Sequence, residues 1–147
     1  MRYQIVIAGV VGGIGILFGT AACGQSKISE CNALIEVLNK GAQNIDKGTK
    51  AVAANPMATG EYKGLADAAE KVADDASKVE LKIPELKKFS TDYQNVMKEF
   101  AKTARDTATA VDAKDTTKMT TAANAMEKVG KQEETLIADI NKFCQAP

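Results

Sequence analysis

Apolar residues recur at helical spacings along four stretches of the chain, alternating three and four in the first two, a pattern typical of helices that each bury one face. The first stretch runs from about residue 27 to residue 54. Asn55-Pro56 should end this helix, because proline disfavours helical geometry at the preceding residue and has no N–H. The stripe of this first helix comprises Ile28, Cys31, Ile35, Leu38, Ala42, Ile45, Thr49 and Val52.

The second stretch extends to Ile83, where Pro84 follows. The third helix is expected to begin either at Pro84, as its first residue, or at Thr91, which Gln94 would complement in a capping box. The second stripe comprises Tyr62, Leu65, Ala69, Val72, Ala76, Val79 and Ile83. The third comprises Leu86 or Phe89, then Tyr93, Val96, Met97, Phe100, Ala104, Ala108 and Val111.

Residues 112–115 are expected to form a turn, after which Asp115 or Thr116 would cap a fourth helix. Glu133 falls near the stripe of this helix. We expect Glu133 to point to water because the stripe drifts; the alternative is a buried carboxylate that needs a partner. The fourth stripe comprises Met119, Ala122, Ala123, Met126, Val129, Leu136, Ile137, Ile140 and Phe143.

No stretch has the alternation of a strand, so the sequence predicts an all-α protein. Four helices with short connections favour an up-down-up-down four-helix bundle. In that topology the start of the first helix, with Cys31, and the end of the fourth, with Cys144, lie at the same end. Several glycines inside the expected helices should weaken them, and these are Gly41, Gly48, Gly64 and Gly130.

The first residues have the layout of a secretory signal: Arg2, then an apolar stretch over residues 5–18, then small residues. The uncharged residues 3–22 are long enough for an uncleaved membrane span, but their glycines weaken a helix and dilute its hydrophobicity. The stretch closes with Gly-Thr-Ala-Ala-Cys at residues 19–23.

These five residues resemble the lipobox of bacterial lipoproteins, although Thr20 stands where that family usually has Leu. The resemblance implies a cleaved signal peptide over residues 1–22, acylation (palmitate) of Cys23, a lipidated tether over residues 23–30 and a disulfide-closed helical domain over residues 31–147. The bilayer would be a partner through Cys23, and Gly24 implies sorting to the outer membrane of the cell envelope, facing the periplasm or the cell surface. The alternative is ordinary cleavage after Ala22.

The composition excludes several kinds of chemistry. The sequence has no His and no Trp, which removes imidazole base catalysis, His-ligated metals and Ser-His-Asp triads. Without Arg2 the net charge is near minus one and Arg105 is the one arginine left, so nucleic acid is not expected as a partner. We therefore expect no catalytic residue, no cofactor, no metal site and no enzymatic activity.

Two cysteines remain once Cys23 is assigned to lipid. In an oxidising compartment the even count predicts a Cys31–Cys144 disulfide; two unpaired buried thiols are the alternative.

Carboxylates cluster on the second helix, where they could bind a hard cation or act in acid–base catalysis. Lysines four positions away favour a solvated, ion-paired face instead. The expected pairs on this helix are Asp67–Lys71 and Asp74–Lys78, and Glu70 and Asp75 are the other carboxylates of the cluster. The same spacing predicts the pairs Glu36–Lys40, Asp46–Lys50 and Glu127–Lys131 on the first and fourth helices.

The leader and the helices resemble those of small helical lipoproteins of Gram-negative bacteria. This resemblance implies a membrane-anchored structural or protein-binding module with an envelope protein as partner. The alternative is a carrier or sensor that holds an apolar small molecule between the helices, for which Phe89, Phe100 and Met126 would line the cavity. An enzyme using carboxylates alone is the least favoured hypothesis.

Overall fold

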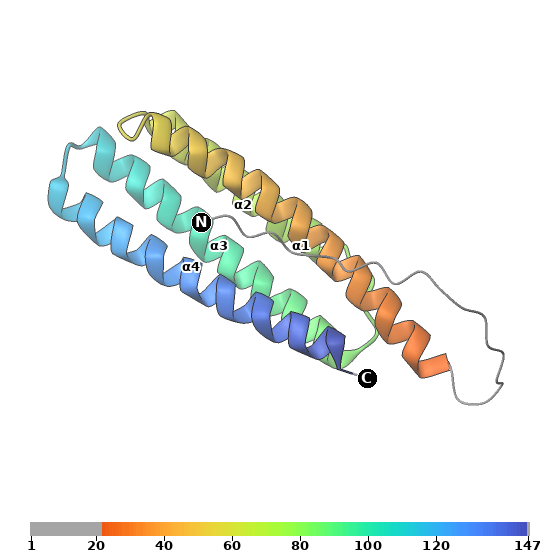
Figure 1. Cartoon of the computed structure of the whole chain (residues 1–147). Helices are drawn as coiled ribbons and strands as arrows, with labels where there is room; N and C mark the ends of the chain where they lie inside the picture. Colours follow the sequence, from red (N-terminus) through yellow and green to blue (C-terminus); the bar gives the residue numbers. More distant parts are fainter. Residues whose placement is uncertain (1–21, 147) are drawn as a thin grey trace.

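The computed structural model describes residues 22–146, with side chains described from Ser26 onward. In this part of the chain four helices follow one another: α1 (Ala22–Ala54), α2 (Thr59–Ser77), α3 (Pro84–Asp112) and α4 (Thr116–Gln145). They run alternately up and down and form an all-α four-helix bundle, which confirms the predicted fold class (Figure 1). The predicted leader lies outside the described residues, except for Ala22.

The helices pack mainly in chain order. α2 packs most extensively against α3, α3 also packs against α4, and α1 packs mostly against α2. α1 and α4 share few contacts, and Figure 1 shows them apart over most of their lengths. The first and last helices therefore depend on α2 and α3, respectively, for most of their packing.

Three helix boundaries follow the predicted signals. α1 ends at Ala54, directly before Asn55-Pro56, and α3 begins at Pro84. Asp115 caps α4, because its Oδ1 accepts a hydrogen bond from the backbone N–H of Lys118 at 3.0 Å. The alternative start of α3 at Thr91 is wrong.

The predicted end of α2 at Ile83 is also wrong, since the helix ends at Ser77. Pro84 disfavours helical geometry at Ile83, which is extended (φ −70°, ψ 122°). The backbone N–H groups of Lys82 and Ile83 donate to Oε2 of Glu30 in α1, at 2.7 and 3.0 Å. The connection therefore finds its hydrogen-bond acceptor on another helix.

The predicted stripe of α1 needs correction. Leu34, which the prediction omitted, is fully buried, whereas Ile28 is 61% exposed and Ala42 and Thr49 are exposed. The face of α1 that packs against the bundle comprises Cys31, Leu34, Leu38, Gly41, Ile45, Gly48 and Val52. Two of the glycines that should weaken the helix are thus contact positions.

The core consists of two hydrophobic clusters along the bundle axis. The disulfide-end cluster comprises Cys31, Leu34, Leu38, Val72, Ala73, Ala76, Leu86, Tyr93, Met97 and Ile140. The distal cluster comprises Leu65, Ala66, Ala69, Phe100, Ala101, Ala104 and Val129. The predicted stripes of α2 and α3 supply most of these side chains. α4 buries only Ala122, Val129 and Ile140, and the predicted stripe residue Ala123 is exposed.

A disulfide joins Cys31 of α1 to Cys144 of α4, with a Cα–Cα distance of 5.7 Å and a sequence separation of 113. The predicted pairing is therefore present, at the end of the bundle where α1 starts and α4 finishes. We call this end the disulfide end, and the end with the turns at residues 55–58 and 113–115 the distal end.

Removing the disulfide with the double substitution Cys31→Ala and Cys144→Ala should lower the free energy of unfolding by about 4 to 5 kcal/mol. The loss arises because the unfolded chain regains the freedom that a closed loop of this length removes. Urea unfolding monitored by circular dichroism measures the difference, and reduction of the wild-type protein should reproduce it. An unchanged urea midpoint after complete reduction would show that the bridge does not stabilise the fold.

Gly41→Ala should destabilise the bundle by about 1 to 2 kcal/mol, although alanine favours helix more than glycine does. An added Cβ would lie 2.5 Å from Cγ1 of Val72 and 3.4 Å from the Tyr93 hydroxyl oxygen. Val72 is buried and β-branched, so it cannot rotate away cheaply. Urea unfolding measures the change.

Gly64→Ala and Gly130→Ala are matched controls, because an added Cβ at either position has no neighbour within 4 Å. Each should stabilise the protein by roughly 0.5 to 1 kcal/mol. If Gly41→Ala stabilised to the same extent as these controls, the close α1–α2 approach would be refuted.

Candidate functional site

The proposed acylation site stands in the same helix as the disulfide. The backbone of Cys23 belongs to α1, and its side chain lies outside the described part of the chain. Residues 23–30, expected as a tether, form the first turns of this helix. Cys23 and Cys31 are eight positions apart, which corresponds to about 12 Å of helical rise.

An aromatic and cationic cluster surrounds the disulfide. Phe89 of α3 and Phe143 of α4 meet edge to face, with ring centroids 5.7 Å apart. Lys27 of α1 places its Nζ 4.7 Å from the Phe143 ring centroid and donates a hydrogen bond to the Ala146 carbonyl at 2.7 Å. These contacts fasten the start of α1 to the end of α4 beside the covalent bond.

Glu30, next to Cys31, adds a polar connection at the disulfide end. Besides the N–H groups of Lys82 and Ile83, its carboxylate accepts a hydrogen bond from the Ser26 hydroxyl at 3.0 Å. The backbone N–H of Ile83 is the main cause of the lowered pKa of Glu30, and it acts against desolvation, which raises that pKa. Glu30 therefore holds the α2–α3 connection against α1 as an ionised group.

The carboxylates of α2 form two sets of ion pairs rather than one acidic site. Arg105 of α3 hydrogen-bonds both Glu70 and Asp67, and its Nη2 lies 2.9 Å from Asp67 Oδ1 and from Glu70 Oε2. The Arg105 guanidinium lowers the pKa of Glu70. The predicted Asp67–Lys71 pair is wrong, because Asp67 binds Arg105 of α3 and Lys71 binds Asp75, four residues further along α2.

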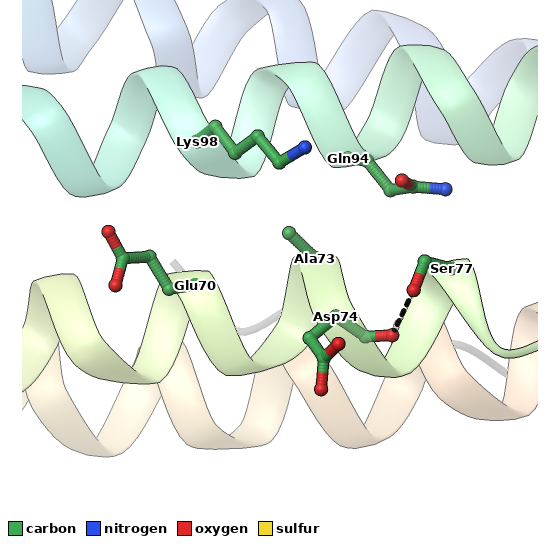
Figure 2. Close-up of a pocket in the computed structure, with 6 residues that line it drawn as sticks. All are labelled: Glu70, Ala73, Asp74, Ser77, Gln94 and Lys98. Atoms are coloured by element: carbon green, nitrogen blue, oxygen red, sulfur yellow. Dashed lines mark hydrogen bonds between the residues drawn. The ribbon is translucent and has the colours of Figure 1, made fainter.

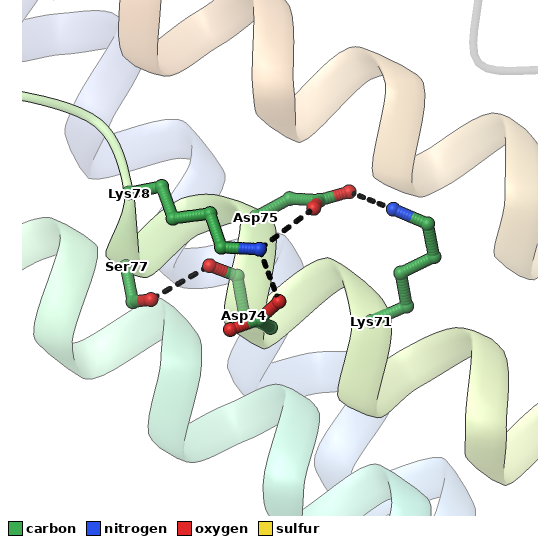
Figure 3. Close-up of polar contacts among 5 residues, drawn as sticks. All are labelled: Lys71, Asp74, Asp75, Ser77 and Lys78. Carbon is green, nitrogen blue, oxygen red and sulfur yellow. Dashed lines mark hydrogen bonds and ion pairs between the residues drawn. The ribbon is translucent and has the colours of Figure 1, made fainter.

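The second set lies on the exposed face of α2 (Figure 3). Lys71 Nζ is 2.6 Å from Asp75 Oδ2, and Lys78 Nζ is 2.5 Å from Asp74 Oδ2, so the predicted Asp74–Lys78 pair is confirmed. The hydrogen bond from Lys71 lowers the pKa of Asp75. The other predicted pairs, Glu36–Lys40, Asp46–Lys50 and Glu127–Lys131, are also confirmed. This face is solvated and ion-paired, as the spacing predicts.

Two shallow depressions lie on the surface of the described chain. One, of about 330 Å³, lies between α2 and α3, where Gln94 and Lys98 of α3 stand opposite α2 (Figure 2). Its lining on α2 is Glu70, Ala73, Asp74 and Ser77. The other, of about 550 Å³, lies between α1 and α2 around Gly48 and Leu65. Both are open to solvent and mix charges of both signs, which does not select a ligand.

Two titratable side chains, Tyr93 and Glu133, are largely removed from solvent within the bundle. Tyr93 of α3 is fully buried, and its hydroxyl forms no hydrogen bond of ordinary geometry within the described residues. Glu133 of α4 is half-buried rather than pointing freely to water, and burial raises its pKa, while the adjacent Tyr93 hydroxyl acts in the opposite direction. Burial and this carboxylate together raise the pKa of Tyr93. The expectation that Glu133 points to water is therefore wrong.

The turn at residues 112–115 serves to end one helix and cap the next. Asp112 Oδ2 lies 3.9 Å from Lys63 Nζ. Asp115 accepts a hydrogen bond from the backbone N–H of Lys118 in the first turn of α4. Over residues 22–146, no group of three or more Asp, Glu, His or Cys side chains is placed to bind a metal ion. Among the described helices, none is both long and apolar enough to cross a bilayer.

The bulky residues considered for a ligand cavity serve in packing. Phe100 is buried in the distal cluster, Met126 packs against that cluster, and Phe89 packs against the disulfide-end cluster and Phe143. Phe89 and Met126 thus pack against different clusters of the core.

No family model matches this sequence, and neither a curated protein nor a solved structure is significantly similar to it.

Sequence reasoning missed the roles of Glu30 and Arg105. Two features of the sequence pointed to Glu30. Ile83 precedes Pro84 and is therefore expected to be extended, so its N–H needs an acceptor outside a helix. Glu30 precedes Cys31, which was predicted to lie at the same end of the bundle as this connection. For Arg105 the signal was its position one residue after Ala104 on the predicted stripe, at the edge facing α2.

Glu30→Gln should lower the melting temperature at neutral pH, because an amide presents a weaker acceptor to the N–H groups of Lys82 and Ile83. A lowered pKa means that the stabilisation by Glu30 is present above the unfolded value near 4.5 and is lost as the pH falls through the folded value. The melting-temperature difference between wild type and variant should therefore shrink in acid.

Glu36→Gln on the exposed side of α1 is the matched control, since Glu36 is bound only by Lys40 within the described contacts. It should change the melting temperature much less. Equal effects of the two substitutions would contradict the role assigned to Glu30.

Proposed function

We propose that this protein is a cell-envelope lipoprotein, held to the membrane by acylated Cys23, whose bundle serves as a structural or protein-binding module. The observation that carries the proposal is the lipobox-like sequence at residues 19–23, directly at the start of a helix that is fastened by a disulfide. Attachment by two or three acyl chains is effectively stable, because each buried CH₂ contributes about 0.8 kcal/mol.

The short distance between the anchor and the fold supports a defined orientation. About 12 Å of helix separates Cys23 from Cys31, so the disulfide end would stand next to the bilayer. α1 has 33 residues, which corresponds to about 50 Å, and the distal turns would lie at that height above the membrane. A helix in place of a flexible tether would give the module a fixed height and direction.

The described surface supports a module rather than a catalyst or a carrier. The carboxylates of α2 are ion-paired, and the two depressions are shallow. Phe89, Phe100 and Met126, the side chains considered for a ligand cavity, pack into the core or against it. A carrier for an apolar ligand would need an enclosed apolar cavity, and neither depression has that form.

The full chain, expressed in a Gram-negative host and extracted from its membranes, should have the mass of a chain that starts at Cys23 and carries acyl groups. Its mass should rise by two hydrogen atoms on reduction, because one disulfide is opened. Intact-mass spectrometry with and without reductant measures both features in one sample.

Cys23→Ser is the matched control, because it removes the acylation site and leaves the disulfide in place. This variant should leave the membrane fraction and show the same gain on reduction. A wild-type chain without acyl groups, cleaved after Ala22 or not cleaved, would refute the anchor, and the search for partners would then move to soluble periplasmic proteins.

A further inference from the structure

The two ends of the Cys31–Cys144 bond differ in their access to solvent. Cys31 is 3% exposed and belongs to the disulfide-end cluster, whereas Cys144 is half-buried and packs against that cluster from the last turns of α4. Thiol–disulfide exchange requires a thiolate to approach one of the two sulfur atoms, and access decides which one is attacked. A reductant therefore reaches the sulfur of Cys144 more readily than the sulfur of Cys31.

The bond connects two helices that otherwise touch little. α1 packs mostly against α2, α4 packs against α3, and α1 and α4 share few contacts. Beside the disulfide, Lys27 of α1 places its Nζ 4.7 Å from the Phe143 ring centroid and donates a hydrogen bond to the Ala146 carbonyl. This hydrogen bond is exposed to solvent, where polar contacts contribute little stability. The covalent bond is therefore the strongest link between α1 and the end of α4.

Each of the two helices has its own attachment to the α2–α3 pair at this end. The Glu30 carboxylate of α1 accepts hydrogen bonds from the N–H groups of Lys82 and Ile83, and Glu30 is 8% exposed. The end of α4 rests on α3 through Phe143, which is only half-buried and meets Phe89 edge to face. Loss of the covalent bond therefore frees the end of α4 more readily than the start of α1.

We propose that the Cys31–Cys144 disulfide is a redox-operated clasp: reduction by a dithiol frees the last turns of α4 from α1, while the bundle keeps its helices. In the oxidised protein the clasp is closed and covers the disulfide-end cluster. In the reduced protein residues 137–146 open and close, and each opening exposes Cys31 and Leu34 of that cluster. An apolar surface thus becomes available at this end only after reduction.

The exchange is balanced by the dithiol alone. One of its thiolates attacks Sγ of Cys144 and forms a mixed disulfide, while Sγ of Cys31 leaves as a thiolate and takes up a proton. The second thiolate of the dithiol then attacks its own sulfur in the mixed disulfide and releases Cys144, which also takes up a proton. The protein gains two electrons and two protons, and the dithiol becomes an internal disulfide.

The direction of attack is tested on the oxidised full chain in detergent with glutathione, a monothiol that stops at the mixed disulfide. After a short exposure and an acid quench, peptide mass spectrometry locates the attached glutathione. It should be found on Cys144 at least roughly tenfold more often than on Cys31. Equal labelling, or more label on Cys31, would overturn the assigned direction. Because the peptides separate Cys23 from the other two cysteines, the result does not depend on whether Cys23 is acylated.

The opening is tested by alkylation after reduction with dithiothreitol and its removal without air. Iodoacetamide should modify Cys31 within roughly tenfold of its rate in urea, where nothing protects it, because the end of α4 opens. Circular dichroism should retain most of the helical signal of the oxidised protein. A slower reaction of Cys31 would show that the reduced bundle stays closed, and loss of the helical signal would show general unfolding. Either result would overturn the clasp.

Two lysine variants of α1 make the test specific. Lys27→Gln removes the cation beside Phe143, so in the reduced protein it should raise the alkylation rate of Cys31 by roughly twofold to fivefold. Lys40→Gln is the matched control, because Lys40 binds Glu36 on the exposed side of the same helix, and it should leave the rate unchanged. Equal rates in both variants would show that Cys31 is reached without release of α4, which would also overturn the clasp.

Discussion

The Cys31–Cys144 bond closes a bundle whose first and last helices otherwise share few contacts. α1 packs mainly against α2, and α4 mainly against α3. The direct connection between α1 and α4 is therefore concentrated at the disulfide end of the bundle. At that end the bond is accompanied by the Phe89–Phe143 contact, by Lys27 over Phe143 and by Glu30 on the α2–α3 connection. Because the net stability of a small domain is modest, this fastening should make up a large share of it.

The packing of the helices also depends on which residues are small. Gly41 and Gly48 let α1 approach Val72 and Leu65 of α2 more closely than side-chain-bearing residues would allow. Alanines on α2 and α3 continue this close packing through the core. The bundle thus gains contact from short distances between its helices as well as from the large side chains of its two clusters.

Sequence reasoning predicted the buried face of a helix where large apolar residues repeat. It failed where small residues, charged residues or residues distant in the sequence determine the packing. The stripe of α3 was predicted because Leu86, Tyr93, Met97 and Phe100 stand at helical spacing. On α1 the pattern selected Ala42 and Thr49 because it gives no weight to glycine as a contact residue. Glu133 was expected to point to water because the stripe was taken to drift along the fourth helix, whereas the residue is half-buried. The extended connection after α2 could not be found locally, since Glu30, which accepts hydrogen bonds from the N–H groups of Lys82 and Ile83, is more than 50 positions away. The Cys31–Cys144 pair of the candidate site could be predicted from the number of cysteines. The partners of Arg105 could not be predicted, because they depend on how α2 and α3 pack against each other.

The position of the disulfide determines what a single proteolytic cut does to the protein. The bond turns residues 31–144 into a covalent ring that contains α1 from Cys31 onward, the whole of α2 and α3, and all of α4 but its last residue. A protease that cuts once in a distal turn, for example beside the exposed Met57, opens this ring without dividing the molecule. Both fragments remain joined through the cysteines, and everything attached to the start of α1 stays attached to the end of α4. A protein cut once would therefore remain one covalently joined molecule, and its separation into two chains would need a second cut or a reductant.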